Sequence, residues 1–272
     1  MRIVMVGAGN LATHLSRALQ NAGHDILQVF SRTEENARLL ADRLNADFTT
    51  SLANLSAEAD IYIVSLKDSA LVECVSDICR GREDKLFVHT AGSIDMQVFE
   101  GYCHRFGVLY PMQSFSKGRE VDFSVIPCFV EANNADDEAV VESLASSVSQ
   151  SVWHFSGEQR KYLHLAAVFA NNFTNHMYAL CAEMLAQHDI PFSTMIPLID
   201  ETAAKIHTLE PRKAQTGPAV RFDRNVMDKQ KALLAYSPEL QQIYELLSKS
   251  IHKTSTNDKL RPFENKDDCL RC

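Results

Sequence analysis

The sequence lacks any apolar run that could cross a membrane, and it has no excess of basic residues. Its longest apolar stretches, such as residues 165–170, are far shorter than the roughly 20 residues that a membrane helix needs. Lysine and arginine number 27 against 35 aspartates and glutamates, so the net charge is −8, which argues against a broad nucleic-acid or anionic lipid surface. A core strand occupies the first residues, where a signal peptide would lie. We therefore expect a cytoplasmic protein with no membrane and no nucleic-acid partner.

The sequence also lacks the short motifs of several enzyme classes. There is no HExxH pair for zinc, no GxSxG nucleophile turn and no GxxxxGK[ST] phosphate loop. We expect no metal, and neither hydrolysis nor phosphoryl transfer. The seven cysteines are an odd number without a disulfide rhythm, which favours reduced thiols. Two of them, Cys269 and Cys272, form a CxxC in a polar tail, which supplies only half of a zinc site.

What the sequence does contain is a glycine-rich turn between a strand and a helix. The strand at 2–6 runs into Gly7-Ala8-Gly9-Asn10-Leu11-Ala12, a GxGxxA turn, and a helix-like stretch to residue 20 precedes a second strand at 26–30. In such a unit the first glycine allows a tight bend, the second lets the backbone approach a pyrophosphate, and the small third residue lets the helix pack closely. The N–H groups at the helix N-terminus would meet the phosphates. The pattern predicts a dinucleotide site, and the alternative is a tight turn without a ligand.

The end of the second strand indicates which dinucleotide binds. NAD-selective sites place an acidic residue there, against the ribose 2′-OH, but this strand ends in Ser31, Arg32 and Thr33. Arg32 can offer a planar fork of donors to a 2′-phosphate, and Ser31 and Thr33 add hydroxyls. We predict NADP(H) as the cofactor. The alternative is a solvated Arg32, with Ser31 or Thr33 capping the next helix.

Strands alternate with helices to about residue 155, and the remainder is helical. Strands are predicted at 47–49, 60–64, 85–89, 107–110, 127–131 and 151–155, and helices at 34–44, 70–79, 136–147, 157–187, 191–209, 224–235 and 238–252. This order predicts an α/β protein with a Rossmann-type doubly wound, mainly parallel sheet. The helix from 157 is apolar on most faces between Tyr162 and Phe173, so we expect it to be a central buried helix. The predicted domains are 1–155 for the nucleotide, 156–255 for a helical domain, and a polar tail at 256–272.

Four further blocks of sequence complete a family pattern. They are His89-Thr90-Ala91-Gly92-Ser93, Tyr110-Pro111-Met112-Gln113-Ser114-Phe115, His164 with Ala170-Asn171-Asn172, and Thr216-Gly217-Pro218 with Arg221 and Asp223. With the glycine turn they resemble a Rossmann-like NADP oxidoreductase family that carries a DUF2520 domain, within the 6-phosphogluconate dehydrogenase-like superfamily. The turn itself is similar to that of pyrroline-5-carboxylate reductases and F420-dependent NADP reductases. Phe222 departs from the pattern where glycine is usual, and Tyr110 departs where a His-Pro pair is usual.

The resemblance implies how the second half of the chain is used. It implies an all-helical domain like the C-terminal domain of 6-phosphogluconate dehydrogenase, which often builds a homodimer. Superfamily members use a lysine and an asparagine from the long helix in their active sites. On that resemblance, His164 and Asn171 are the leading catalytic candidates here.

Polar residues follow several strands of the predicted sheet. Ligands of an open α/β sheet lie beyond the carboxyl ends of its strands, so the segments 65–69, 90–93 and 111–113 are expected around the nicotinamide. The predicted cofactor contacts are Gly7, Gly9, Asn10, Leu11, Ser31, Arg32, Thr33, Ser65, Ala91 and Gly92, and the predicted substrate contacts are Ser93, Gln113, Lys161, Asn175 and Arg221. For Asp68 and Ser69 we favour helix capping. For Arg221 the alternative to a substrate carboxylate or phosphate is an ordinary ion pair, with Asp223 or elsewhere.

The long predicted helix carries the candidate chemistry. Lys161, His164, Asn171, Asn172 and Asn175 recur at helical spacings, which bring them towards one side. Hydride transfer to a carbonyl or imine leaves an atom that needs a proton, and histidine, with an ordinary pKa of about 6.5, can supply one near neutrality. The amide of Asn171 could orient the acceptor. The alternative is a core histidine and asparagine that satisfy each other.

The sequence therefore predicts an oxidoreductase. It would transfer a hydride between NADP(H) and a small carbonyl or imine metabolite in a cleft between the two domains. The alternative from another class is a non-catalytic NADP(H)-binding or sensing protein, since a fold does not by itself imply a function.

Overall fold

The chain divides into two compact units. The computed structural model describes residues 1–116 and 118–256, and its units are Met1–Met177 and the chain from Tyr178 onward. The predicted domain boundary at residue 155 stays a prediction. The CxxC at Cys269 and Cys272, and the predicted tail beyond residue 256, lie outside the described residues.

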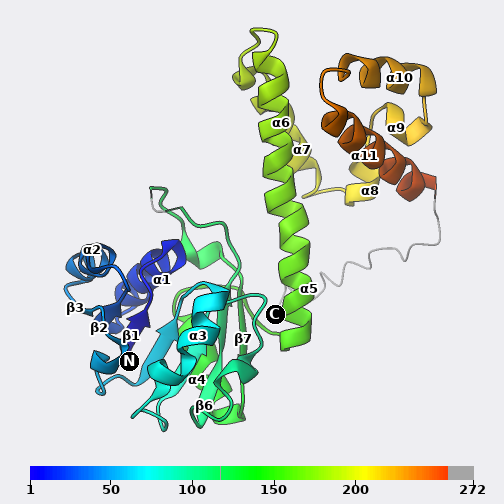
Figure 1. Cartoon of the computed structure of the whole chain (residues 1–272). Coiled ribbons are helices and arrows are strands. Elements are labelled where there is room, and N and C mark those ends of the chain that lie inside the picture. Colours follow the sequence, from blue (N-terminus) through cyan, green and yellow to red (C-terminus); the bar gives the residue numbers. More distant parts are fainter. Residues whose placement is uncertain (117, 257–272) are drawn as a thin grey trace. The chain divides into compact units, whose positions relative to one another are not determined.

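One sheet forms the centre of the first unit (Figure 1). In the described residues its strands are β1 (Arg2–Val6), β2 (Asp25–Phe30), β3 (Asp47–Thr49), β4 (Ile61–Val64), β5 (Leu86–His89), β6 (Arg105–Pro111), β7 (Cys128–Ala132) and β8 (Val152–His154). The spatial order is β3-β2-β1-β4-β5-β6-β7-β8, and all neighbours are parallel except β6 and β7. The chain order reverses between β1 and β4, which is the switch point where such sheets bind ligands. The predicted Rossmann-type, mainly parallel sheet is confirmed.

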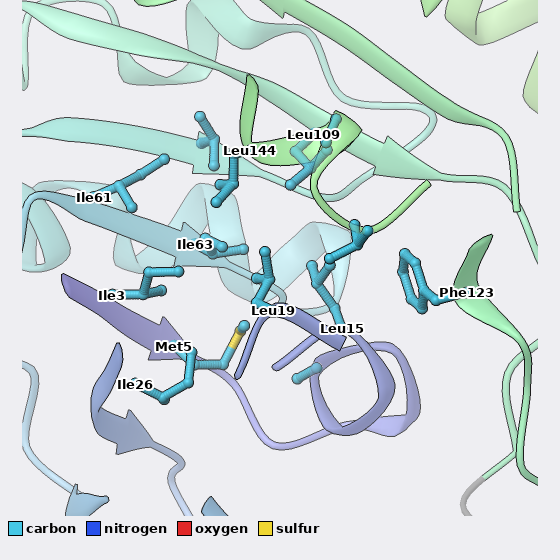
Figure 2. Packing of buried hydrophobic residues seen from close by; sticks show 14 of the residues in the cluster. Ile3, Met5, Leu15, Leu19, Ile26, Ile61, Ile63, Leu109, Phe123 and Leu144 are labelled. Carbon is cyan, nitrogen blue, oxygen red and sulfur yellow. The ribbon is translucent and has the colours of Figure 1, made fainter. Parts of the chain in front are cut away.

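Helices cover both faces of the sheet. Successive strand residues point to opposite sides, so apolar side chains lie on both faces and need to be covered. Ile3 and Met5 of β1 face the cluster built with α1 (Asn10–Asn21), α2 (Glu34–Leu44) and α4 (Ala135–Ser146) (Figure 2). Val4 and Val6 face the other cluster, which includes α3 (Asp68–Cys79) and the 3₁₀ turns η1 (Leu52–Asn54) and η2 (Met96–Phe99). A third short turn, η3 (Phe123–Val125), packs near α1. The central strands β1, β4 and β5 are thus buried on both faces.

A long helical stretch follows the sheet. It consists of α5 (Gly157–Ala167), a π-helical segment η4 (Val168–Phe173) and α6 (Thr174–Ala186). Ser156 and Gln159 form a reciprocal capping box at its start. The prediction of a central buried helix is wrong for this chain. Its apolar stripe of Tyr162, Leu165, Phe169 and Phe173 is 69%, 53%, 63% and 50% exposed, because no described part of the first unit covers it.

The second unit is helical. It contains η5 (Phe192–Met195), α7 (Ile196–Lys205), α8 (Pro211–Ala214), α9 (Pro218–Arg221), α10 (Arg224–Leu233) and α11 (Pro238–Thr256). The helix predicted at 191–209 therefore splits into a 3₁₀ turn and a shorter α-helix. Phe222, which stands where the family pattern has glycine, adopts a left-handed φ of 53°, and its ring stacks on His252 at 4.5 Å. Within the described residues, none of the helices is long and apolar enough to cross a membrane.

Candidate functional site

The glycine loop after β1 is held against the loop after β4. Gly7 has a φ of +131°, and its N–H donates to the Phe30 carbonyl at 2.8 Å. A Cβ on Gly7 would lie 2.2 Å from the Ser65 carbonyl oxygen, so only glycine fits both the conformation and the space. Gly9 differs, because a Cβ there would meet nothing within 4 Å. The loop thus packs tightly at Gly7 and leaves open space in front of Gly9.

The first turn of α1 presents main-chain donors to that open space. Gly9 occupies the N-cap position and has no side chain with which to cap the helix, and the first turn holds no acidic residue. The N–H of Thr13 donates to the Gly9 carbonyl at 3.0 Å, so the N–H groups of Asn10 and Leu11 precede the first intrahelical bond. The Leu11 side chain packs towards the core, while the Asn10 amide donates to the Phe115 carbonyl at 2.8 Å. Such a terminus favours a bound anion.

The residues at the end of β2 lie at the surface. Arg32 and Thr33 are exposed and Ser31 is half-buried. Thr33 is the N-cap residue of α2, but neither its side chain nor that of Ser31 caps the helix, so the capping alternative is wrong. Instead Ser31 Oγ accepts from the Thr33 N–H at 3.3 Å, and the Asn36 amide donates to Thr33 Oγ1 at 3.2 Å. In the part of the chain that the structure describes, no carboxylate pairs with Arg32.

The loops after β4 and β5 are joined by a side-chain hydrogen bond. Ser93 Oγ donates to the Asp68 carboxylate in a short contact. The N-cap residue of α3 is Lys67, and its first turn has no side-chain cap, so the expected capping by Asp68 and Ser69 is wrong. Asp68 is the first residue of the helix instead, which directs its carboxylate to the neighbouring loop. Ser93 is consequently committed to Asp68 in this chain.

His89 fixes the start of the β5 loop from within the core. Its side chain is fully buried, and its Nδ1 accepts from the Ala91 N–H at 3.1 Å. Nε2 has no hydrogen-bond partner in the described residues. Burial, together with the smaller effect of the nearby Arg160 charge, lowers the pKa of His89 to about 3. His89 therefore stays neutral and holds the main chain that leads into Gly92.

The β5 loop meets a tyrosine and a histidine from distant parts of the chain. Tyr110 Oη lies 3.0 Å from His164 Nδ1, and the two rings form an edge contact at 6.1 Å. A Cβ on Gly92 would lie 2.7 Å from His164 Nδ1 and 2.8 Å from Tyr110 Cζ. Gly92 has no positive φ, so its role is to leave room for the pair. Burial raises the pKa of Tyr110, which keeps its hydroxyl protonated.

A cavity of about 490 Å³ opens beside this pair within the first unit. Its lining residues are Tyr110, Met112, Gln113, Ser114, Leu163, His164, Ala166, Ala167, Val168, Ala170, Asn171 and Asn172. His164, Asn171 and Gln113 were predicted as site residues and are brought together here. The π-helical segment widens the helix at this point, so that both Asn171 and Asn172 reach the lining.

Other predicted substrate residues do not line the cavity. Lys161 Nζ lies 3.7 Å from an Asp95 carboxylate oxygen. Asn175 is exposed on α6, and Arg221 is exposed in the second unit. Asp223 caps α10 by accepting from the Val226 N–H at 3.3 Å, and within the described residues no ion pair joins it to Arg221.

Sequence reasoning missed Tyr110 as part of the site. The signal was present in the sequence. Tyr110 ends the strand predicted at 107–110, whose carboxyl end should face the ligand, and it departs from the family pattern there. Asn172 was recognised as polar on the right helix but was given no role. In the described residues, no group of three histidine, cysteine or acidic side chains is arranged to hold a metal ion.

Comparisons with known proteins identify the family of this chain. Residues 2–92 match the family described as NADP oxidoreductase coenzyme F420-dependent, and residues 126–251 match the domain of unknown function DUF2520. The solved structure of "putative NADP oxidoreductase BF3122" from Bacteroides fragilis is 56% identical, with a TM-score of 0.88, and the alignment covers 93% of this chain and 98% of that one. The chain belongs to this NADP oxidoreductase family. The predicted family, oxidoreductase class and NADP dependence are confirmed at that level.

More distant structures share the fold of this NADP oxidoreductase family. A reductive aminase from Aspergillus terreus is 14% identical with a TM-score of 0.69, and the match covers 93% of this chain and 94% of that one. A 1-pyrroline-5-carboxylate reductase from Streptococcus pyogenes is 14% identical with a TM-score of 0.61, covering 93% and 98%. Among curated proteins, none matches this chain.

Proposed function

We propose that this chain is an NADPH-dependent reductase that transfers a hydride to a carbon–oxygen or carbon–nitrogen double bond of a small metabolite. The observation that carries the proposal is the position of Gly92. It lies in the loop after β5, next to the strand at the switch point of the sheet, and it also contacts His164 at the cavity. Gly92 therefore lies where two parts of the proposed site meet. One is the edge of the sheet that would bind the dinucleotide, and the other is the cavity that holds the proposed proton donor.

The residues present fit NADPH. The open space at Gly9 and the free N–H groups of Asn10 and Leu11 would hold its pyrophosphate, and the exposed Arg32 would hold the 2′-phosphate with the hydroxyls of Ser31 and Thr33. We assign Ser65, Ala91 and Gly92 to the nicotinamide end, because their loops follow β4 and β5. When bound, the cofactor supplies the hydride.

In this proposal His164 and Asn171 perform the chemistry that the chain itself supplies. His164 donates a proton to the oxygen or nitrogen that gains charge as the hydride arrives, and the Asn171 amide orients that atom. Gln113 lines the same cavity and can add a hydrogen bond, although its Oε1 now accepts from the Ser114 N–H at 2.8 Å. Ser93 and Lys161 act indirectly, through Asp68 and Asp95.

The cavity lining also supports a class of substrate. Apart from His164, the lining side chains are uncharged, and methionine, leucine, valine and alanine form much of its wall. A small, largely apolar ketone or imine fits these surroundings better than a multiply charged metabolite, whose charges would lose hydration without a partner. Reductive aminase and pyrroline-5-carboxylate reductase, among the structures that share the fold, carry names of the same reaction class.

We further propose that the chain is a cytoplasmic homodimer. The exposed stripe of Tyr162, Leu165, Phe169 and Phe173 supports the dimer, because contiguous apolar surface of this kind is typical of an interface. Free thiols at the five described cysteines fit a reducing compartment. Light scattering at micromolar concentration tests the dimer, and a monomeric mass would contradict it. Thiol trapping in cells tests the compartment, and oxidised cysteines would contradict it.

The proposed reaction is tested by isotope transfer. Purified protein is incubated with NADPH deuterated at C4 and a panel of small cyclic imines and ketones, and the products are analysed for stereospecific deuterium at the reduced carbon. We expect His164→Ala to lower the rate roughly 100-fold or more, since general acid catalysis contributes about 10²–10⁴. His176→Ala, an exposed histidine on α6, is the matched control and should leave the rate unchanged. Wild-type turnover in His164→Ala would overturn the role of His164.

A further inference from the structure

Tyr110 reaches from the sheet to the proposed proton donor. In the described residues its hydroxyl is the hydrogen-bond partner of His164, at 3.0 Å from Nδ1. We propose that Tyr110 is a positioning residue for His164, which binds Nδ1 so that Nε2 is the nitrogen that presents a proton to the substrate. The inference rests on the proposed function and adds a residue to which the sequence assigned no role.

The hydroxyl of Tyr110 is held rigidly. Tyr110 is buried near the end of β6 and pairs with Phe129 of the antiparallel neighbour β7. The centroids of the two rings lie 6.2 Å apart. Gly92 lies against the Tyr110 ring on another side. A hydroxyl fixed by the sheet can therefore determine where the exposed imidazole of His164 points.

The helix that carries His164 is anchored to the same part of the sheet. Arg160, one turn before His164, is buried, and its guanidinium donates to a Glu131 carboxylate oxygen at 2.6 Å and to the Ile94 carbonyl at 2.8 Å. The Gly157 N–H donates to the other Glu131 oxygen at 3.1 Å. Because β7 and the β5 loop both hold the first turns of α5, the distance between Tyr110 and His164 is set by the fold.

A phenol suits this role because it serves both charge states of the ring. The raised pKa of Tyr110 keeps the O–H, which can donate to Nδ1 of the neutral imidazole, and the oxygen can accept from Nδ1–H of the imidazolium. The imidazolium then carries the proton that faces away from Tyr110 on Nε2, and the neutral ring carries it there when Tyr110 donates to Nδ1. A phenylalanine in this place would leave the neutral ring free to carry its proton on either nitrogen.

The proton transfer balances with this assignment. As the hydride and its two electrons leave NADPH for the substrate carbon, the Nε2–H bond of the imidazolium breaks and a new O–H or N–H bond forms on the substrate. Nδ1–H stays on the ring and donates to Tyr110 Oη. NADP⁺, the reduced substrate and a neutral imidazole are left, and Nε2 regains a proton from water before the next turnover.

The tautomer of His164 can be measured without any substrate. The protein is labelled with ¹⁵N-histidine, and the His164 signal is assigned by its loss in His164→Gln. We expect the neutral ring to carry its proton on Nε2 in the wild type and to show a mixture of tautomers in Tyr110→Phe. Tyr62→Phe is the matched control, because it removes a buried hydroxyl that donates to the Ser56 carbonyl elsewhere in the sheet. An unchanged tautomer in Tyr110→Phe would overturn the proposal.

Kinetics separate this proposal from the proposed function. With an imine that the wild type reduces, we expect Tyr110→Phe to lower kcat about 10-fold, with KM and NADPH affinity little changed. Adding Tyr110→Phe to His164→Gln should cause no further loss, since the two residues act as one unit. A normal rate in His164→Gln would contradict the proposed reaction itself. A slow His164→Gln beside a Tyr110→Phe with wild-type kcat would contradict only the role of Tyr110.

Discussion

The two halves of the candidate site are built from different parts of the chain. The nucleotide half consists of main-chain atoms from one continuous stretch, the loop after β1 and the first turn of α1. The reaction half consists of side chains far apart in sequence, with Tyr110 and His164 separated by 54 residues and joined over Gly92. A local stretch of sequence can encode most of the first half. The second half exists only when a strand, a loop and a helix are folded together.

Their glycines illustrate the same difference. Gly7 is required by its own backbone conformation and by the Ser65 carbonyl next to it. Gly92 adopts no special conformation, and it is required because two side chains from elsewhere occupy the space of a Cβ. Only the first kind of glycine leaves a motif that can be recognised without the structure.

Replacing Gly7 is the strongest test of the nucleotide half. In Gly7→Ala the new Cβ would lie 2.2 Å from the Ser65 carbonyl oxygen, at a φ of +131° that alanine rarely adopts. We expect a clear fall in melting temperature and a loss of NADPH affinity of roughly 100-fold or more, measured by thermal unfolding and calorimetry.

Gly9→Ala is the matched variant. Its Cβ meets nothing within 4 Å, so the melting temperature should be that of the wild type, while NADPH affinity falls because the methyl group stands where the pyrophosphate should approach. Wild-type affinity in both variants would show that the cofactor does not bind at this loop.

Much of the first unit could be predicted from sequence because its elements are set by local patterns. The bounds of β1, α2 and β3 agree with the predicted ranges, since alternating or helical apolar spacing and turn residues are read over a few positions. The prediction that Asp68 caps a helix was wrong because local sequence does not show long-range contacts. The Asp68 carboxylate accepts from Ser93, which lies 25 residues away, and only the fold brings the two together.

The long helix shows the opposite limit. Apolar residues on most of its faces predicted burial, yet the pattern states only that a surface is apolar, not what covers it. His164 and Asn171 were predicted from helical spacing together with the family resemblance, and both line the cavity. Tyr110 was not assigned a role, because its contacts with Gly92 in the β5 loop and with His164 in α5 join residues that are far apart in sequence.

Arg32 tests whether the nucleotide half also contains a specific side chain. If its exposed guanidinium binds the 2′-phosphate, Arg32→Ala should weaken NADPH binding by about 30-fold, corresponding to about 2 kcal/mol for hydrogen bonds to a charged group. NADH binding should not change, because NADH has no 2′-phosphate. Arg38→Ala is the control, since that exposed arginine on α2 pairs with Glu34. Equal losses for both nucleotides would mean that Arg32 does not select the phosphate.

His89 holds the loop that carries Gly92, and its burial predicts how the fold responds to acid. The native ring stays neutral with a pKa of about 3, whereas in the unfolded chain an ordinary histidine takes up a proton below about pH 6.5. Between these two pH values the unfolded state therefore binds more protons than the folded state. As the pH falls, this proton uptake lowers the free energy of unfolding by up to about 1.4 kcal/mol per pH unit.

The variant His89→Asn tests this pH dependence, because its side-chain oxygen can still accept from the Ala91 N–H. Between pH 6.5 and 5, the free energy of unfolding measured in urea should change with pH by up to about 1.4 kcal/mol per unit less than in the wild type. His104→Asn, an exposed position, should keep the wild-type slope, and an unchanged slope in His89→Asn would mean that the buried ring is not what links the β5 loop to pH.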